Sequence, residues 1–266
     1  MSAGVGNDYV SSMNSPNPLA ASTPAFRVTM AFTIGLVICS FGSSAIGAEP
    51  EAQPGSETTK SQKSEAQQEY EENIKAVADL LPKRHITRRP LNDETSRLWF
   101  DRFLNDLDPR RLYFTSQDID RFRKHRDALD DHARRGDVSF ALLVGRTFTR
   151  RVKQATKWGE AFLAKKHDFT ANEEFVLKPE QFADGRRELR ERWRLRVKHD
   201  LLTQRTLGLT EQQAVEKLRT RYRRIAQENS YSDERELLEL FLDSLARTYD
   251  PHSAYLGERT LIQFRN

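Results

Sequence analysis

Two short segments of the sequence share a pattern of residues whose side chains could organise a functional turn. Each segment has Asp-Pro, three variable residues, and then Tyr followed by an apolar residue. The residues are Asp108, Pro109 and Tyr113 in the first copy, and Asp250, Pro251, His252, Tyr255 and Leu256 in the second. Proline ends the preceding helix, aspartate can accept hydrogen bonds from the turn, and the Tyr-apolar pair can pack the turn against a core. The pattern therefore predicts two similar helix-to-helix corners.

Motifs that identify common enzyme active sites are missing from the sequence. It contains no Gly-x-Ser-x-Gly, no His-Glu-x-x-His, no Walker loop and no Gly-x-Gly-x-x-Gly, and no Lys has Ser or Thr three residues before it. The histidines are scattered, and we interpret paired acids such as Glu173 and Glu174 as solvated helix ends rather than as an acid–base pair. We therefore predict no catalytic residue, no cofactor and no metal site in this chain.

A strongly basic stretch of the sequence could form a docking surface. Between residues 181 and 227 there are 13 Lys and Arg residues against 6 Asp and Glu residues. The arginines that we expect to form this surface are Arg186, Arg187, Arg190, Arg194, Arg219 and Arg223. Nucleic-acid binding would use exposed aromatic rings for stacking, but Trp193 and Tyr222 lie on apolar helical stripes and should be buried. We therefore expect a solvated surface, or one that faces an acidic partner, rather than a nucleic-acid site.

The first 48 residues have the features of an export signal. The apolar run of residues 30–41 follows Arg27 and precedes small residues that end at Ala48. This order is typical of a secretory signal peptide, and we expect cleavage after Gly47, with an uncleaved membrane anchor as the alternative. Residues 49–69 contain no large apolar residue, so burial cannot offset the entropy of ordering them. We predict a disordered polar linker there.

Helical periodicity dominates the remainder of the chain. Apolar or small residues recur every three or four positions between residues 138 and 162, and shorter stripes of this kind occur around Trp99, Val197, Leu218 and Phe241. No apolar run after residue 48 approaches the ~20 residues that a membrane-spanning helix needs. The sequence therefore predicts an all-α fold, with about seven amphipathic helices of ordinary length in one domain over residues 70–266.

The two Asp-Pro segments and their flanks resemble a known family. Residues 107–119 read Leu-Asp-Pro-Arg-Arg-Leu-Tyr-Phe-Thr-Ser-Gln-Asp-Ile, and residues 249–256 read Tyr-Asp-Pro-His-Ser-Ala-Tyr-Leu. Together with Gln263 and Phe264, they look like the amino-terminal helical region of bacterial tail-specific, or carboxy-terminal processing, serine proteases. The similarity covers residues 70–266 and keeps the order and spacing of both motifs.

The resemblance implies a periplasmic endopeptidase in which the helical region precedes a PDZ domain and a catalytic core. Such an enzyme would recognise apolar carboxy termini through its PDZ domain and cut peptide bonds with a Ser nucleophile and a Lys general base, without metal or nucleotide. This chain stops at Asn266, where the PDZ domain would begin, so we expect that no catalytic residue of the family can be transferred to it.

We therefore expect an amino-terminal scaffold that is catalytically silent alone. Its partners would be the remainder of the protease, an adaptor protein and unfolded protein substrates, and the second Asp-Pro segment would form the hinge into the following domains. The alternative is a free-standing exported helical module that binds a protein through the basic face of residues 186–224.

Overall fold

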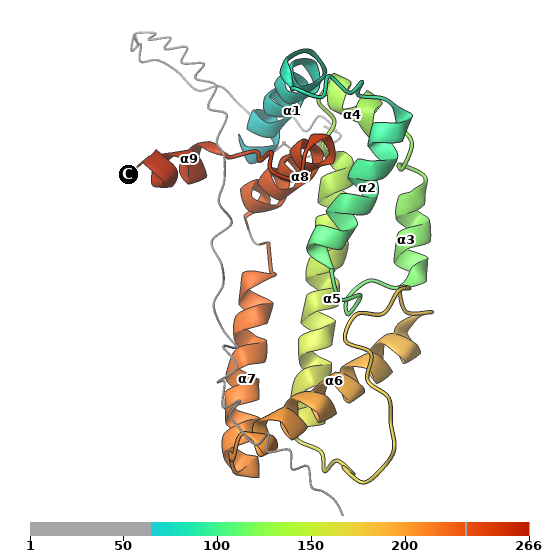
Figure 1. Cartoon of the computed structure of the whole chain (residues 1–266), viewed down its shortest axis with the longest axis vertical. Coiled ribbons are helices and arrows are strands. Elements are labelled where there is room, and N and C mark those ends of the chain that lie inside the picture. The colour runs from blue at the N-terminus through green and yellow to red at the C-terminus, as the bar shows by residue number, and fades with distance from the viewer. Residues whose placement is uncertain (1–64, 232, 266) are drawn as a thin grey trace, which may run out of the picture.

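The computed structural model describes residues 65–231 and 233–265 of the chain. The predicted export signal of residues 1–48, and residues 49–64 of the predicted linker, lie outside this part. The described residues form nine helices (Figure 1): α1 Glu65–Arg84, α2 Asp93–Leu107, α3 Ser116–Arg123, α4 Leu129–Arg135, α5 Ser139–Leu163, α6 Arg186–Thr206, α7 Glu211–Glu228, α8 Glu234–Tyr249 and α9 Glu258–Arg265.

The all-α prediction is confirmed for the described residues, whose only β-type pairing is an isolated bridge between Thr115 and Ala183. Two of the helices, α3 and α4, are too short to produce a visible apolar period, so the structure has more helices than the about seven that periodicity predicts. Helix α1 begins at Glu65 and buries Ala66, so the boundary that the sequence predicts at residue 70 lies inside this helix.

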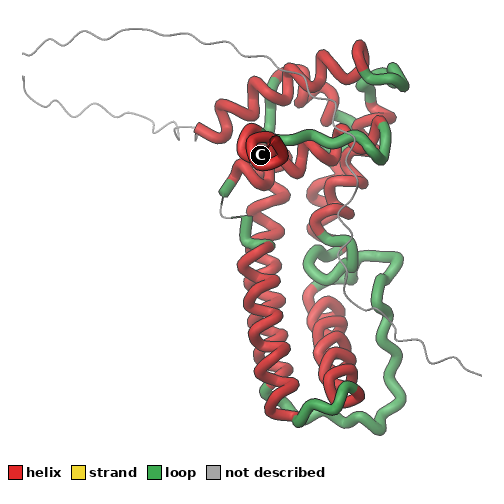
Figure 2. The backbone as a smooth tube through the Cα atoms, turned by 60° about the vertical axis from the view of Figure 1, so that its left-hand side comes forward, coloured by secondary structure: helices red, strands yellow, loops and turns green. Residues whose placement is uncertain are grey.

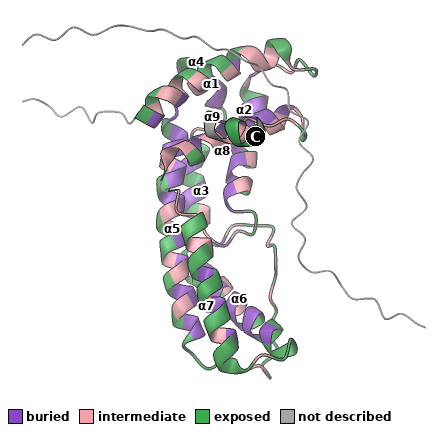
Figure 3. Ribbon diagram, turned by 90° about the vertical axis from the view of Figure 1, so that its left-hand side faces the viewer, coloured by how far each residue is buried: buried purple, intermediate pink, exposed green. Residues whose placement is uncertain are grey.

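Helix α5 is the longest of the described helices and connects the two halves of the bundle. Its 25 residues connect the two ends of the bundle in Figures 1 and 2. Helix α8 packs on its N-terminal half, where Phe140 also contacts the rings of α2, and α6 and α7 pack on its C-terminal half. Helices α1, α2 and α4 pack on α8 or on one another, and α3 contacts α5. The buried residues of each helix face these neighbours (Figure 3), as the predicted apolar stripes require.

The first of two buried clusters is aromatic at its centre. Trp99 of α2 stacks on Phe241 of α8 with 4.2 Å between ring centroids, and its Nε1–H donates to the Phe241 carbonyl oxygen at 2.9 Å. Phe103 and Phe140 contact the same Phe241 ring at 4.9 and 6.0 Å between centroids. These rings are buried, and their contacts hold α2 against α8.

The second cluster lies between α5, α6 and α7 and contains a buried polar group. The Tyr222 hydroxyl and the Arg196 Nε–H both donate to one Asp200 carboxylate oxygen, each at 2.8 Å. The Trp193 ring meets Tyr222 edge-on. The prediction that Trp193 and Tyr222 are buried is therefore confirmed, and neither ring is available for base stacking.

Two glycines end helices with positive φ but have different surroundings. Gly136 follows α4 with φ +76°, and Gly208 follows α6 with φ +83°. A Cβ atom on Gly136 would lie 2.7 Å from the Glu71 carbonyl oxygen of α1, whereas one on Gly208 would meet no atom within 4 Å. Close packing of α1 on α4 thus depends on the missing side chain at Gly136.

Replacing these glycines should therefore give unequal losses. Gly136→Ala should lower the free energy of unfolding by about 3 kcal/mol, because backbone strain adds to a steric clash. Gly208→Ala, the matched control, should cost only the strain of about 1 kcal/mol. Urea denaturation followed by circular dichroism measures both values, and equal losses would contradict the close approach of α1 to α4.

Candidate functional site

The first Asp-Pro turn is organised by one buried carboxylate. Asp108 follows the last residue of α2 and is 1 % exposed. Its Oδ1 accepts the Leu112 N–H at 2.8 Å, and its Oδ2 accepts the N–H groups of Tyr113 and Phe114, both at 2.9 Å. Pro109 brings no N–H of its own to the turn. One side chain thus satisfies three consecutive backbone donors, which would otherwise be buried without partners.

These three residues reach into both buried clusters. Phe114 belongs to the first cluster and Leu112 to the second, while Tyr113 packs against both. The Trp193 Nε1–H donates to the Leu112 carbonyl oxygen at 2.7 Å, which joins α6 to the turn. The Asp108 turn therefore connects the two halves of the bundle.

Burial dominates the ionisation of this turn. It raises the pKa of Asp108 above its usual range, against the opposing effect of the backbone donors at residues 112–114. Burial, helped by the neighbouring Asp108 charge, also raises the pKa of Tyr113 to about 12. Both groups are enclosed by protein, and their observed role is structural.

The second Asp-Pro turn is more open. Asp250 follows α8 in an extended conformation, and its Oδ1 accepts the His252 N–H at 2.7 Å. Its carbonyl oxygen accepts the Ser253 N–H at 3.0 Å. Pro251 and His252 are exposed. Both predicted corners therefore exist, but only the first is built around a buried carboxylate.

The residues after this turn are attached to α8 by two further carboxylates. We name residues 250–257 the exit segment, because they lead from α8 to α9, which lies outside the bundle in Figure 1. Asp243 accepts the Tyr255 N–H and Glu239 accepts the Gly257 N–H, each at 3.0 Å. These acids are spaced four residues apart, so they lie on one face of α8.

Helix α1 and His85, the residue that follows it, hold the other side of the exit segment. The His85 Nε2 and Ser253 hydroxyl oxygen are 3.0 Å apart, and the His85 ring meets Tyr249 edge-on. The rings of Tyr255 and Tyr70 are 6.4 Å apart between centroids. The exit segment is therefore held between α8 on one side and α1 with His85 on the other, and side chains from both sides set its path.

The predicted basic docking surface is only partly assembled. Trp158 and Phe162 of α5 line a groove of about 1100 Å³, which we name the α6 groove. Its predicted cationic residues are Arg186, Arg187, Arg190 and Arg194. Arg219 and Arg223 lie on α7 outside this groove and pair with Glu216 at 2.7 Å and Glu160 at 3.0 Å.

Carboxylates from a distant loop neutralise part of this surface. Glu173 pairs with Arg194 and Lys198 of α6, and Arg194 also pairs with Glu191. The hydrogen bond from Arg194, together with that from Lys198, lowers the pKa of Glu173 to about 2. The interpretation of Glu173 and Glu174 as a helix end is wrong, because both lie in the loop between α5 and α6. The basic surface is therefore less cationic than residue counts suggest.

Two features of α5 were not singled out by the sequence. Arg151 forms a bidentate pair with the buried Asp118 of α3, with N–O distances of 2.8 and 3.0 Å. This pair connects α3 to α5, and no pattern in the sequence indicates it. The other feature is a row of exposed cations at residues 146, 150, 153 and 157, whose spacing of four, three and four could have indicated one helix face.

The described residues contain neither a metal-binding cluster nor a membrane-spanning helix. Within residues 65–231 and 233–265, no three His, Cys, Asp or Glu side chains come together in a way that could bind a metal ion. In the same part of the chain, no helix combines the length and the apolarity needed to cross a bilayer.

Comparison with known proteins agrees with the two-turn architecture. Residues 76–259 match the family described as "Tail specific protease N-terminal domain". The chain belongs to this family. The matched tail-specific protease region includes both Asp-Pro turns and the complete exit segment, so the resemblance that these segments predict is confirmed.

A curated relative is much longer than the region that matches this chain. The protein named "Tail-specific protease" from Haemophilus influenzae is 26 % identical to this chain over 193 residues. The aligned region covers 71 % of this chain and 28 % of that protein. The chain thus corresponds to little more than a quarter of this relative, in keeping with the match to an N-terminal domain.

Substitution of the two turn aspartates should separate their roles. Asp108→Asn turns one acceptor oxygen into an N–H donor facing buried backbone donors, and should lower the free energy of unfolding by about 2 kcal/mol. Asp250→Asn keeps an acceptor for its single N–H partner and should cost less than about 0.5 kcal/mol. Chemical denaturation measures both, and a smaller loss at Asp108 than at Asp250 would refute the buried-anchor role.

Proposed function

We propose that this region is the amino-terminal helical frame of a periplasmic tail-specific serine endopeptidase. The single observation that carries the proposal is the exit segment, which contains a family motif and is held from the sides of α8 and α1 at Ser253, Tyr255 and Gly257. A frame must fix the position and direction at which its chain continues. This geometry supports that role.

Close packing at the end of the exit segment supports the same conclusion. A Cβ atom on Gly257 would lie 2.7 Å from a Glu239 carboxylate oxygen and 3.0 Å from the Tyr70 hydroxyl. Residue 257 therefore has little room for a side chain. A segment packed this closely leaves the bundle along a defined path.

Peptide-bond cleavage would be supplied by domains outside this region. Following the family resemblance, these would be a PDZ domain that recognises apolar carboxy termini and a core with a Ser nucleophile and a Lys base. We propose that the region alone is inactive and that residues 1–48 direct export to the periplasm. The remaining domains and unfolded protein substrates would be its partners.

A free-standing protein-binding module is the second candidate. The α6 groove favours it, because Arg186 and Arg190 lie over the buried rings of Trp158 and Phe162 at its wall. The pairing of Arg194, Arg219 and Arg223 with carboxylates weakens this candidate, since paired cations attract an acidic partner less strongly.

A chimera tests the frame directly. Residues 76–259 of this chain would replace the matching region of the Haemophilus influenzae tail-specific protease, and cleavage of an unfolded reporter with an apolar carboxy terminus would be assayed. In the active chimera, Glu239→Ala/Asp243→Ala should lower kcat/KM at least about tenfold, because a small displacement of attached domains misplaces the reacting groups.

The matched control in the chimera is Glu211→Ala/Glu216→Ala, which removes two acids from α7 at the other end of the bundle. It should change kcat/KM less than about twofold. An inactive chimera, or equal effects of the two double variants, would count against the frame. The full chain alone should not cleave the reporter, and cleavage by a pure preparation would exclude a purely structural role.

Hydrogen exchange provides an independent check on the exit segment. In the full chain, the amide groups of Tyr255 and Gly257 should exchange slowly, because each donates to a carboxylate of α8. Glu239→Ala/Asp243→Ala should speed their exchange at least about tenfold without changing that of α2. Unchanged exchange, measured by NMR or mass spectrometry, would show that these carboxylates do not hold the segment.

A further inference from the structure

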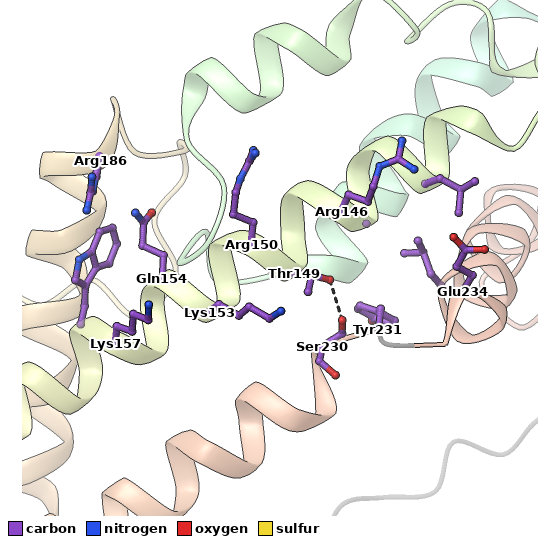
Figure 4. Close-up of a pocket in the computed structure, with 14 residues that line it drawn as sticks. Arg146, Thr149, Arg150, Lys153, Gln154, Lys157, Arg186, Ser230, Tyr231 and Glu234 are labelled. Atoms are coloured by element: carbon purple, nitrogen blue, oxygen red, sulfur yellow. Dashed lines mark hydrogen bonds between the residues drawn. The ribbon is translucent and has the colours of Figure 1, made fainter. Parts of the chain in front are cut away.

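A second groove, lined by the cationic face of α5, carries an inference beyond the proposed frame. We name it the α5 groove; it has a volume of about 800 Å³ and lies between α5, the start of α6 and the start of α8 (Figure 4). Its cationic residues are Arg146, Arg150, Lys153, Lys157 and Arg186. Glu234 of α8 is the one carboxylate among its lining residues in the described part of the chain.

Several cations of α6 and α7 are ion-paired, whereas the row of cations on α5 that lines this groove is not. Arg192, Arg194 and Arg219 each form an ion pair with a neighbouring carboxylate. Within the part of the chain that the structure describes, no carboxylate forms an ion pair with the α5 cations at positions 146, 150, 153 and 157. These positions recur at steps of three and four, so like charges repel along one helix face. A bound anion would relieve that repulsion, and a groove lined by one charge attracts anions from solution.

Beneath the cations, the α5 groove has an apolar base. Leu142 of α5 and Leu237 of α8 line it, and each is 4 % exposed. The rim near Tyr231 is fixed by the Thr149 hydroxyl, which donates to the Ser230 carbonyl oxygen at 2.8 Å (Figure 4). A ligand here would thus need both carboxylates for the rim and aliphatic groups for the base.

The dimensions match a short piece of polypeptide. With a rise of 1.5 Å per residue in a helix, the row of cations from Arg146 to Lys157 is roughly 16 Å long. An extended peptide advances about 3.3 Å per residue, so about five residues would span it. Alternating side chains of such a peptide point in opposite directions, which lets carboxylates and aliphatic groups face different parts of the groove.

We propose that the α5 groove binds an acidic polypeptide segment whose carboxylates alternate with aliphatic side chains. Charge complementarity with the unpaired row favours an anion, and the leucines favour a peptide over a nucleic acid. Base stacking would require an exposed aromatic ring, whereas Trp158 is buried and its face is covered by Arg186 at 5.8 Å. This proposal does not depend on the role of the exit segment.

The test uses the full chain and a fluorescent peptide of alternating Glu and Leu residues, with binding measured by fluorescence anisotropy. The wild-type chain should bind this peptide, and an otherwise identical peptide with Gln in place of Glu should bind at least about tenfold more weakly. Affinity for the acidic peptide should fall as salt rises toward about 0.15 M, because the rim cations are exposed.

Charge reversal locates the site. Lys153→Glu/Lys157→Glu should raise Kd at least about tenfold, because two attractions become repulsions. The matched control, Lys217→Glu/Arg221→Glu, reverses two exposed cations with the same spacing on α7, outside the groove, and should raise Kd less than about twofold. Circular dichroism checks that each variant folds. If the Lys153→Glu/Lys157→Glu variant does not fold, Lys153→Gln/Lys157→Gln takes its place and should raise Kd about threefold.

Three results would overturn the proposal: no binding by the wild-type chain, equal weakening by the groove and control variants, or equal binding of the Gln peptide. A further binding measurement uses a single-stranded oligothymidylate with the same formal charge as the acidic peptide. If it binds more tightly than the acidic peptide and loses affinity in the groove variant, the site is a general polyanion site rather than a peptide site.

Discussion

The carboxylate of Asp108 is the interaction on which the arrangement of the bundle depends. Without it, three consecutive backbone N–H groups would be buried without acceptors, at a cost of about 1–3 kcal/mol each. With it, the chain can turn sharply inside the protein and send neighbouring side chains into both apolar clusters. The packing of α6 and α7 against the C-terminal half of α5 is thereby tied to the packing of α2 and α8 against its N-terminal half.

The second copy of the same sequence pattern has a different structural role because its surroundings differ. At Asp250 the turn lies at the edge of the bundle, and its carboxylate bonds a single backbone N–H. The acids that shape the following residues are Glu239 and Asp243, which belong to the preceding helix rather than to the motif. The tyrosines also diverge, since Tyr113 lies between the two clusters whereas Tyr255 packs on α1.

Much of the fold could be predicted from the sequence because each long helix carries its own apolar period. The stripe of residues 138–162 became α5, and the buried positions of Trp193 and Tyr222 followed from the same rule. The site was less predictable. A count of basic residues cannot show that Glu173 and Glu160 reach arginines far along the chain, and spacing alone cannot show which face of α5 its neighbours leave uncovered. Such facts depend on tertiary contacts, which periodicity does not encode.

Helix α8 borders both the α5 groove and the exit segment. Its first turns, with Glu234 and Leu237, border the α5 groove, and its later turns, with Glu239 and Asp243, hold the exit segment. A helix moves as a nearly rigid rod, so a translation of α8 displaces both regions at once. Any occupant that prefers one position of this rod would be thermodynamically linked to the direction in which the polypeptide leaves the bundle, and the linkage would act equally in reverse.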